Sequence, residues 1–96
     1  MNLAELKNLE DTSTLSIALQ ALCEDRRGDW DRAHTLSQEA NNRDGDWVHA
    51  YLHRKEGDIG NAGYWYARAG RDPQGADVSL EAEWDTIATE LLGRSE

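Results

Sequence analysis

Apolar residues recur along this chain at the spacing of helices that bury one face. The first long stripe occupies positions i, i+3, i+4, i+7 and i+8, namely Leu15, Ala18, Leu19, Leu22 and Cys23. Residues at these separations lie on one side of an α-helix. The stripe therefore predicts a helix over residues 13–27, with its N-terminal cap among the polar residues 11–14.

A Gly–Asp pair ends this helix and recurs farther along the chain. Gly28 and Gly57 are 29 residues apart, and an aspartate follows each of them. Glycine readily adopts the left-handed conformation that ends many helices, and an aspartate can cap the next helix with its carboxylate. The residues that follow the two pairs also correspond, as Trp30, Ala33 and Ala40 in the first copy and Ile59, Ala62 and Ala69 in the second. The repeat predicts two similar helical hairpins, stacked side by side.

The rest of the chain adds further helices and their connections. Leucines at positions 3, 6 and 9 predict a short helix over residues 2–10. The remaining expected elements are helices over 30–41, 46–56 and 59–69, a turn over 41–45, a loop over 71–78 and a final helix over 79–96. The third long helix should bury Trp47, Val48, Tyr51 and Leu52, and the fourth Ile59, Ala62, Gly63, Tyr66 and Ala69.

We therefore expect an all-α fold with the whole chain, 1–96, as a single domain. Residues 1–12 form an N-terminal extension, and 13–70 form two stacked antiparallel hairpins. The helix over 79–96 is amphipathic and is expected to cap the open end of the stack.

The second half of each hairpin resembles a tetratricopeptide repeat. Gly57, Ile59, Ala62, Tyr66 and Ala69 match the family's spacing of glycine, large and small residues, and Gly28, Trp30, Ala33 and Ala40 match it in the first copy. The resemblance covers residues 17–70 and implies a helical module that binds other proteins. The stretches 47–58 and 61–70 also resemble a group of small uncharacterised bacterial proteins, which implies an all-helical domain.

Charge and cysteine usage restrict the classes of partner. The formal net charge is −9, and such a field repels nucleic acid and anionic lipid. We therefore expect neither as a partner. The N-terminus shows no signal-peptide pattern, and the only cysteine, Cys23, falls on a buried stripe and cannot form an internal disulfide. These features favour a reducing, cytoplasmic location.

Two groups of polar side chains are candidates for binding. His49, His53 and Glu56 are spaced at i, i+4 and i+7 and are expected on the polar side of their helix, opposite its core face. Such a stripe can be a solvated surface, a partner contact or a set of metal ligands. Tyr64 and Arg68 share one side of the next helix and, together with Asn61, could form a hydrogen-bonding surface. A cation–π pair that only stabilises the helix is the alternative.

The sequence favours a non-enzymatic protein-interaction module that needs no cofactor and no metal. Its groove is expected between the first and third long helices, with the stripe His49, His53 and Glu56 on or near it. The alternative is a small metal- or ligand-binding enzyme that uses this same stripe. A homodimer, in which a second copy covers the exposed repeat face, is a third possibility.

Overall fold

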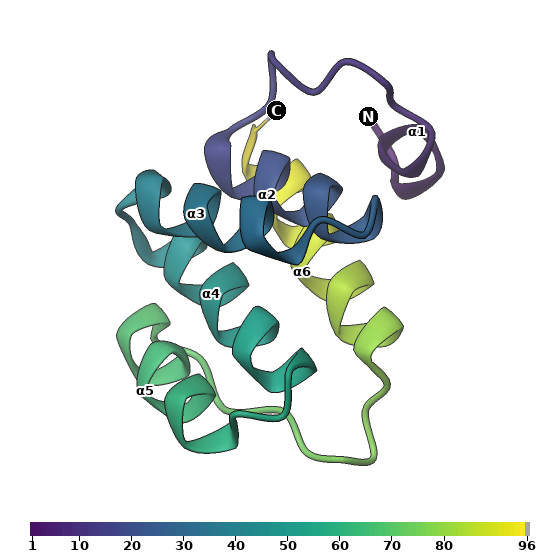
Figure 1. The fold of residues 1–96 in the computed structure, drawn as a ribbon. Coiled ribbons are helices and arrows are strands. Elements are labelled where there is room, and N and C mark those ends of the chain that lie inside the picture. Colours follow the sequence, from purple (N-terminus) through teal and green to yellow (C-terminus); the bar gives the residue numbers. More distant parts are fainter. Residues whose placement is uncertain (96) are drawn as a thin grey trace.

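The computed structural model describes residues 1–95, and this part of the chain forms six helices and no strand (Figure 1). The helices are α1 (Leu3–Lys7), α2 (Ile17–Arg26), α3 (Trp30–Ala40), α4 (Arg43–Lys55), α5 (Ile59–Ala69) and α6 (Leu80–Ser95). The expected all-α fold is confirmed. Glu96, the last residue of the predicted final helix, lies outside the described residues.

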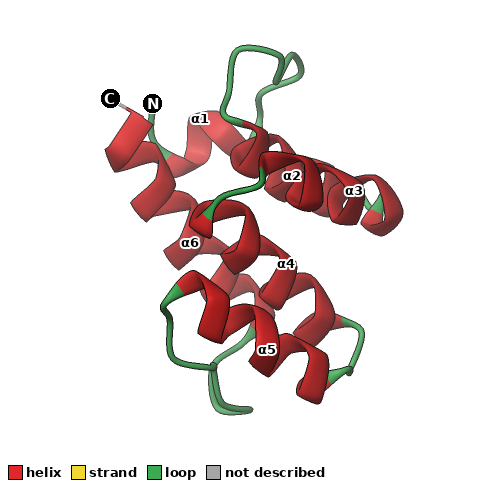
Figure 2. Cartoon of the chain, turned by 90° about the vertical axis from the view of Figure 1, so that its left-hand side faces the viewer, coloured by secondary structure: helices red, strands yellow, loops and turns green. Residues whose placement is uncertain are grey.

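The helices form two hairpins and a closing helix. Helix α2 pairs with α3, and α4 pairs with α5, so the predicted hairpins are both present. The two hairpins lie side by side because α4 also packs against α2 and α3 (Figures 1 and 2). Helix α6 in turn packs on both α2 and α4. Helix α4 is therefore the central element, with four other helices around it.

The two Gly–Asp turns have the same geometry. Gly28 and Gly57 have φ angles of 90° and 88°, which place both in the left-handed region. The amide of Asp29 donates to the carbonyl of Glu24, and that of Asp58 donates to the carbonyl of His53, at 3.0 and 2.9 Å. Each aspartate then caps the next helix through its side chain. These are Schellman turns followed directly by N-caps, and they explain why the hairpins close so tightly.

Helix α2 begins four residues later than the predicted start at residue 13. Residues 12–15 form a turn in which the amide of Leu15 donates to the carbonyl of Thr12. Asp11 binds the amide of Ser13 and so stabilises this turn instead of capping a helix. Ser16 is the actual N-cap, and its hydroxyl accepts from the amide of Leu19. Several adjacent residues can cap a helix, so the sequence alone does not identify the first residue of α2.

Helix α4 also differs from its prediction, because the expected turn over 41–45 is mostly helical. Asn41 has a left-handed φ of 49° and ends α3, while Asn42 caps α4 through the amide of Gly45. A Cβ at Gly45 would lie 2.6 Å from the carbonyl oxygen of Ser37 and 2.7 Å from the Cβ of Ala40. Gly45 therefore allows α3 and α4 to approach closely and does not form a turn.

Helix α6 lies along the side that α2 and α4 share. Its buried residues are Glu83, Trp84, Ile87, Ala88, Leu91 and Leu92. The indole of Trp84 donates a hydrogen bond of 3.0 Å to the carbonyl of Leu22 in α2. The groove that was expected between the first and third long helices is thus filled by the chain's own last helix.

A buried ionic network attaches α6 to the second hairpin. Glu83 of α6 is 2% exposed, and its carboxylate receives hydrogen bonds from Arg54 of α4, at 2.9 Å, and from the hydroxyl of Tyr66 of α5. Arg54 also donates to the backbone carbonyls of Gly75 and Val78 in the connection before α6. One guanidinium therefore holds both the buried carboxylate and the loop that leads to it.

Two residues that were both expected in the core differ in their burial. Cys23 is buried, and this burial raises the pKa of its thiol, as expected for a residue on the core stripe. Ile59, in contrast, was expected in the core but is 65% exposed. No helix among residues 1–95 is long and apolar enough to cross a membrane.

Replacing Gly57 by alanine should lower the free energy of unfolding by about 1 kcal/mol, because a side chain strains the left-handed backbone. Gly60 is the matched control, since it lies in α5 with a helical backbone and a Cβ added there would meet no atom within 4 Å. Gly60→Ala should instead stabilise by about 0.5–1 kcal/mol, since alanine favours the helix. Urea titration measures both changes. Equal effects of the two substitutions would contradict the assigned turn.

Replacing Glu83 by alanine should destabilise the fold by about 3–5 kcal/mol, because Arg54 would remain buried without its carboxylate. Glu81 is the control on the same helix, and its side chain is 69% exposed beside Lys7 and Arg26. Glu81→Ala should change the free energy of unfolding by no more than about 0.5 kcal/mol. Thermal and urea unfolding measure the difference. A Glu83→Ala variant as stable as Glu81→Ala would show that the network contributes nothing.

Candidate functional site

The two histidines of α4 are in the interior of the protein. His49 is 2% exposed and His53 is 6% exposed. The prediction that they lie on a solvated polar face was wrong. It assumed that α4 has one side toward water, but α3 and α5 cover the side opposite the Trp47 and Tyr51 face. The expected position of this stripe on the groove between the first and third helices is wrong as well.

Three histidines and two tryptophans from three helices form one cluster of aromatic rings. We call the group Trp30, His34, His49, His53 and Trp65 the histidine–tryptophan cluster. The ring centroids of His34 and His49 are 4.6 Å apart, those of His34 and His53 5.2 Å, and those of His49 and His53 4.7 Å. Trp30 stacks on His34 at 4.9 Å, and Trp65 stacks on His49 at 3.8 Å. The cluster contains every histidine of the chain.

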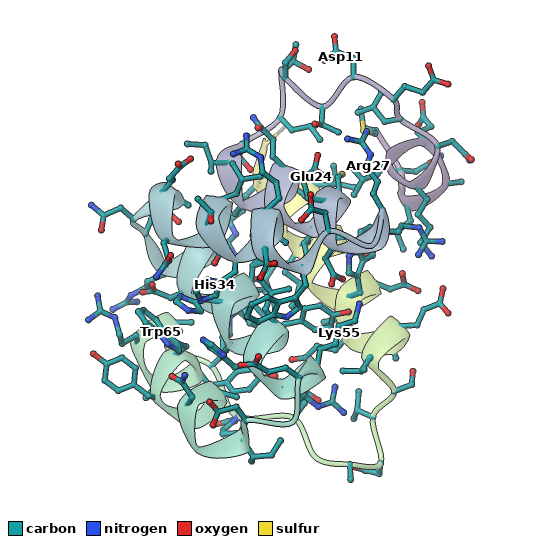
Figure 3. The ribbon with its side chains drawn as sticks, viewed as in Figure 1. Asp11, Glu24, Arg27, His34, Lys55 and Trp65 are labelled. Carbon is teal, nitrogen blue, oxygen red and sulfur yellow. The ribbon has the colours of Figure 1, made fainter. Side chains whose placement is uncertain are left out.

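Helices α3 and α5 supply the outer part of this cluster. His34, Trp30 and Trp65 are each partly buried, so the cluster reaches the surface at these residues. Figure 3 shows His34 and Trp65 on one side of the molecule and Lys55 on the other. The cluster therefore faces away from the side that α6 covers.

The hydrogen bonds of the two buried imidazoles differ. Nδ1 of His53 lies 2.6 Å from Oε1 of Glu56, the residue that caps the C-terminus of α4. Nδ1 of His49 is buried and has no hydrogen-bond partner among residues 1–95. Leaving such a group without a hydrogen bond costs about 1–3 kcal/mol. The cluster therefore contains one ring nitrogen whose burial is not compensated by a hydrogen bond.

The electrostatic environment favours the neutral form of two of these imidazoles, His49 and His34. Burial, together with repulsion from His34 and His53, lowers the pKa of His49 to about 4. Burial and His53 also lower the pKa of His34, although Glu56 and Asp31 oppose the shift. Neutral imidazoles have a free lone pair, which a proton donor or a metal ion can use.

The residues that could hold a metal ion are these same histidines. One ring nitrogen from each of His34, His49 and His53 can be chosen such that all three lie within 4.8 Å of one another. A second set, His53, Glu56 and Asp58, meets the same distance limit at the end of α4. Of the predicted stripe, His53 belongs to both sets, whereas His49 occurs only in the first and Glu56 only in the second.

The other predicted surface, around Tyr64 and Arg68, is exposed as expected. Tyr64 is 56% exposed, and Nη1 of Arg68 lies 3.4 Å from its hydroxyl. The guanidinium also lies 5.3 Å from the ring centroid of Trp65 and approaches Asp46 at 3.6 Å. Asn61 is exposed at the start of α5, where its side chain bonds to Asp58. Tyr64 and Arg68 thus adjoin the histidine–tryptophan cluster through Trp65.

A hollow of about 350 Å³ lies on the opposite side, among α2, α4 and α6. Its buried carboxylate, Asp25, already accepts from the hydroxyl of Tyr51 at 3.2 Å and from the ammonium of Lys55 at 2.8 Å. Burial and Asp25 raise the pKa of Tyr51, which keeps the phenol protonated. These groups satisfy one another, so the hollow offers less chemistry than the histidine–tryptophan cluster.

Sequence reasoning missed His34 and Trp30 as members of the site. His34 follows the small residue Ala33 on α3 and shows no periodic relation to the histidines of α4. Only the contact between α3 and α4 brings them together. The one usable signal in the sequence was the i, i+4 spacing of His49 and His53, which places two of the chain's three histidines on one side of their helix.

Comparisons with protein-family models, curated proteins and solved structures find no match to this chain. The function is therefore inferred from the geometry of the cluster and the surface beside it.

Stability should fall in mild acid because of His49. The folded pKa of about 4 lies below the unfolded value of 6.5, so between these values the unfolded chain binds more protons. This contribution is complete above pH 6.5 and is lost as the pH falls toward 4. Urea unfolding in chelator-treated buffer at pH 7.5, 6 and 5 measures it. A His49→Gln variant, which cannot titrate there, should show a shallower decline. Identical slopes would contradict the assignment.

Proposed function

We propose that this chain is a non-enzymatic protein-interaction module of tetratricopeptide-like helical-repeat type that acts in the cytoplasm. The proposal rests on the aromatic and arginine side chains that stay exposed while α6 occupies the side of α2 and α4. Tyr64 and Arg68 on α5 project into solvent, with the half-buried Trp65 between them. Tyrosine, tryptophan and arginine are the side chains that most often supply binding energy at protein interfaces.

The anchors also have a suitable frame. Tyr64 lies edge-on against Trp65 at a centroid distance of 5.1 Å, and Arg68 lies over both rings. Rings that are already packed lose little conformational freedom on binding, which favours affinity. Helix α5 therefore presents a preorganised aromatic surface.

Acidic side chains beside the adjoining histidine–tryptophan cluster favour a partner segment that carries basic residues. Glu56 and Asp58 are exposed at the end of α4, and Asp31 acts electrostatically on His34. The chain as a whole has a formal charge of −9. Complementary charge guides the encounter and selects partners, so a basic peptide with an apolar residue fits this face best. A second copy of the chain, with the same charge, fits it less well.

A cytoplasmic location is part of the proposal. The single cysteine, Cys23, is buried and has no internal disulfide partner, which suits a reducing compartment. Membership of the tetratricopeptide family is likewise a proposal, supported by the two Gly–Asp hairpins and their small residues.

The double change Tyr64→Ala with Arg68→Ala should weaken peptide binding at least tenfold, because it removes both anchors from the surface. A random peptide library selected against the wild-type chain supplies the probe, and enrichment of lysine and arginine is expected. Fluorescence anisotropy then measures the dissociation constants, with circular dichroism to confirm the fold. The affinity should also fall as salt is raised, because the attraction is partly electrostatic.

The control for this experiment is Ile17→Ala with Thr89→Ala, two exposed positions on α2 and α6. It should bind like the wild type. A folded Tyr64/Arg68 variant with unchanged affinity would exclude this surface. Failure to enrich any peptide would count against the module itself. Self-association that the double change abolishes, measured by analytical ultracentrifugation, would replace the basic peptide by a second copy.

A further inference from the structure

The three histidines converge in a way that the proposed peptide binding does not explain. They come from positions 34, 49 and 53, on two helices, and have one ring nitrogen each within 4.8 Å of the others. Nitrogen ligands of a tetrahedral zinc ion with bonds of about 2.0–2.1 Å lie about 3.4 Å apart. Small rotations of the imidazoles would close this difference. We propose that His34, His49 and His53 bind a divalent transition-metal ion, with zinc as the best fit.

The unsatisfied nitrogen of His49 is the independent observation that points to a ligand. This side chain is 2% exposed, and its Nδ1 has no hydrogen-bond partner in the described part of the chain. A packed aromatic core has no need of such an atom, since phenylalanine would fill the same space at no cost in desolvation. Ligation of a metal by His49 gives this polar ring a role that packing alone does not.

Glu56 supplies the second feature of a metal centre. Its Oε1 lies 2.6 Å from Nδ1 of His53, which leaves Nε2 of that ring for the metal. A histidine that binds a metal through one ring nitrogen commonly donates a hydrogen bond from the other nitrogen to a carboxylate. This bond fixes the orientation of the ring and makes the ligating nitrogen more basic. In this arrangement Glu56 is an orienting residue beside the three ligands. The sequence had placed it in line with His49 and His53 as an equal partner.

The ligand type and surroundings decide the class of ion. Three imidazole ligands suit zinc, cobalt, nickel and copper, whereas magnesium and calcium prefer oxygen. Zinc accepts three protein ligands and keeps a fourth position for water. Entry from solvent is past His34, Trp30 and Trp65, which are all partly buried. Asp31, Glu56 and the net charge of −9 attract a divalent cation to this face.

This site does not depend on the proposed peptide surface. Tyr64 and Arg68 belong to α5 and supply no ligand, whereas His34, His49 and His53 belong to α3 and α4. Either proposal can therefore fail without the other.

The test uses the full chain stripped of metal with a chelator and titrated with zinc chloride. We expect one equivalent to bind with a dissociation constant in the micromolar range or below, measured by competition with a chromophoric chelator. Cobalt(II) chloride should give visible absorption bands of a four-coordinate site. In the proton NMR spectrum, one equivalent of cobalt should shift the ring signals of all three histidines.

His34→Phe is the main variant, because it keeps a ring against Trp30 and removes the nitrogen from the least buried ligand. It should bind zinc at least 100-fold more weakly and lose the zinc-induced rise in melting temperature. Glu56→Gln tests the orienting residue at an exposed position, and a drop in affinity of about 10–100-fold is expected. Glu39→Gln, exposed on α3, is the acidic control and should bind like the wild type.

The proposal would be overturned if the wild-type chain bound no zinc or cobalt under these conditions. It would also be overturned if cobalt left the histidine signals unchanged, because the ion would then sit on surface carboxylates. A folded His34→Phe variant that bound zinc as tightly as the wild type would overturn the proposal too. If His34→Phe does not fold, the NMR result on the wild type and the Glu56→Gln affinity decide the question.

Discussion

The buried carboxylate of Glu83 is the constraint on which the arrangement of the helices depends. A charge that is 2% exposed must be paired, and its partners Arg54 and Tyr66 come from α4 and α5. Burial and the contact with Glu83 raise the pKa of Tyr66, so its hydroxyl remains a donor. The pairing fixes where α6 can lie along the second hairpin. Because Trp84 is adjacent to Glu83, it also brings this indole against the carbonyl of Leu22 in the first hairpin.

This closure determines which face of the protein is free. In a stack of hairpins the first helices line a groove, but here α6 occupies the side of α2 and α4. The exposed aromatic surface and the histidine–tryptophan cluster are both on the other side of α4, where Trp65 belongs to both. The ring of Trp65 stacks on the buried His49 and also contacts the guanidinium of the exposed Arg68. The proposed protein-binding surface and the proposed metal site thus share Trp65.

The features predictable from the sequence were those that short segments determine. The Gly–Asp turns need only a left-handed glycine and a capping carboxylate, so Gly28 and Gly57 identified both hairpins. The range 59–69 of α5 and the start of α3 at Trp30 were correct, whereas the start of α2 was displaced because several cap residues compete there. Gly45 resembled a turn glycine, yet its missing Cβ serves the contact between α3 and α4. Such a contact cannot be read from neighbours in the chain.

The candidate site was predictable only in part, for the same reason. Helical spacing placed His49 and His53 on one side of α4, and this was correct. The spacing could not tell that α3 and α5 would cover that side, because a helix with four neighbours has no single core face. His34 joined them through packing between helices alone. A polar stripe on a central helix is therefore evidence for a buried site as much as for a solvated one.

The tryptophans have a consequence for optical work on this chain, which contains four of them and no phenylalanine. Each indole lies at a different junction. The indole of Trp30 donates to the carbonyl of Leu52 between α3 and α4, and Trp65 joins α5 to α4. Trp84 joins α6 to α2, and Trp47 lies 3.9 Å from the guanidinium of Arg71, just beyond α5. Four single-tryptophan versions would thus give four separate fluorescence reporters, each sensitive to the opening of one joint.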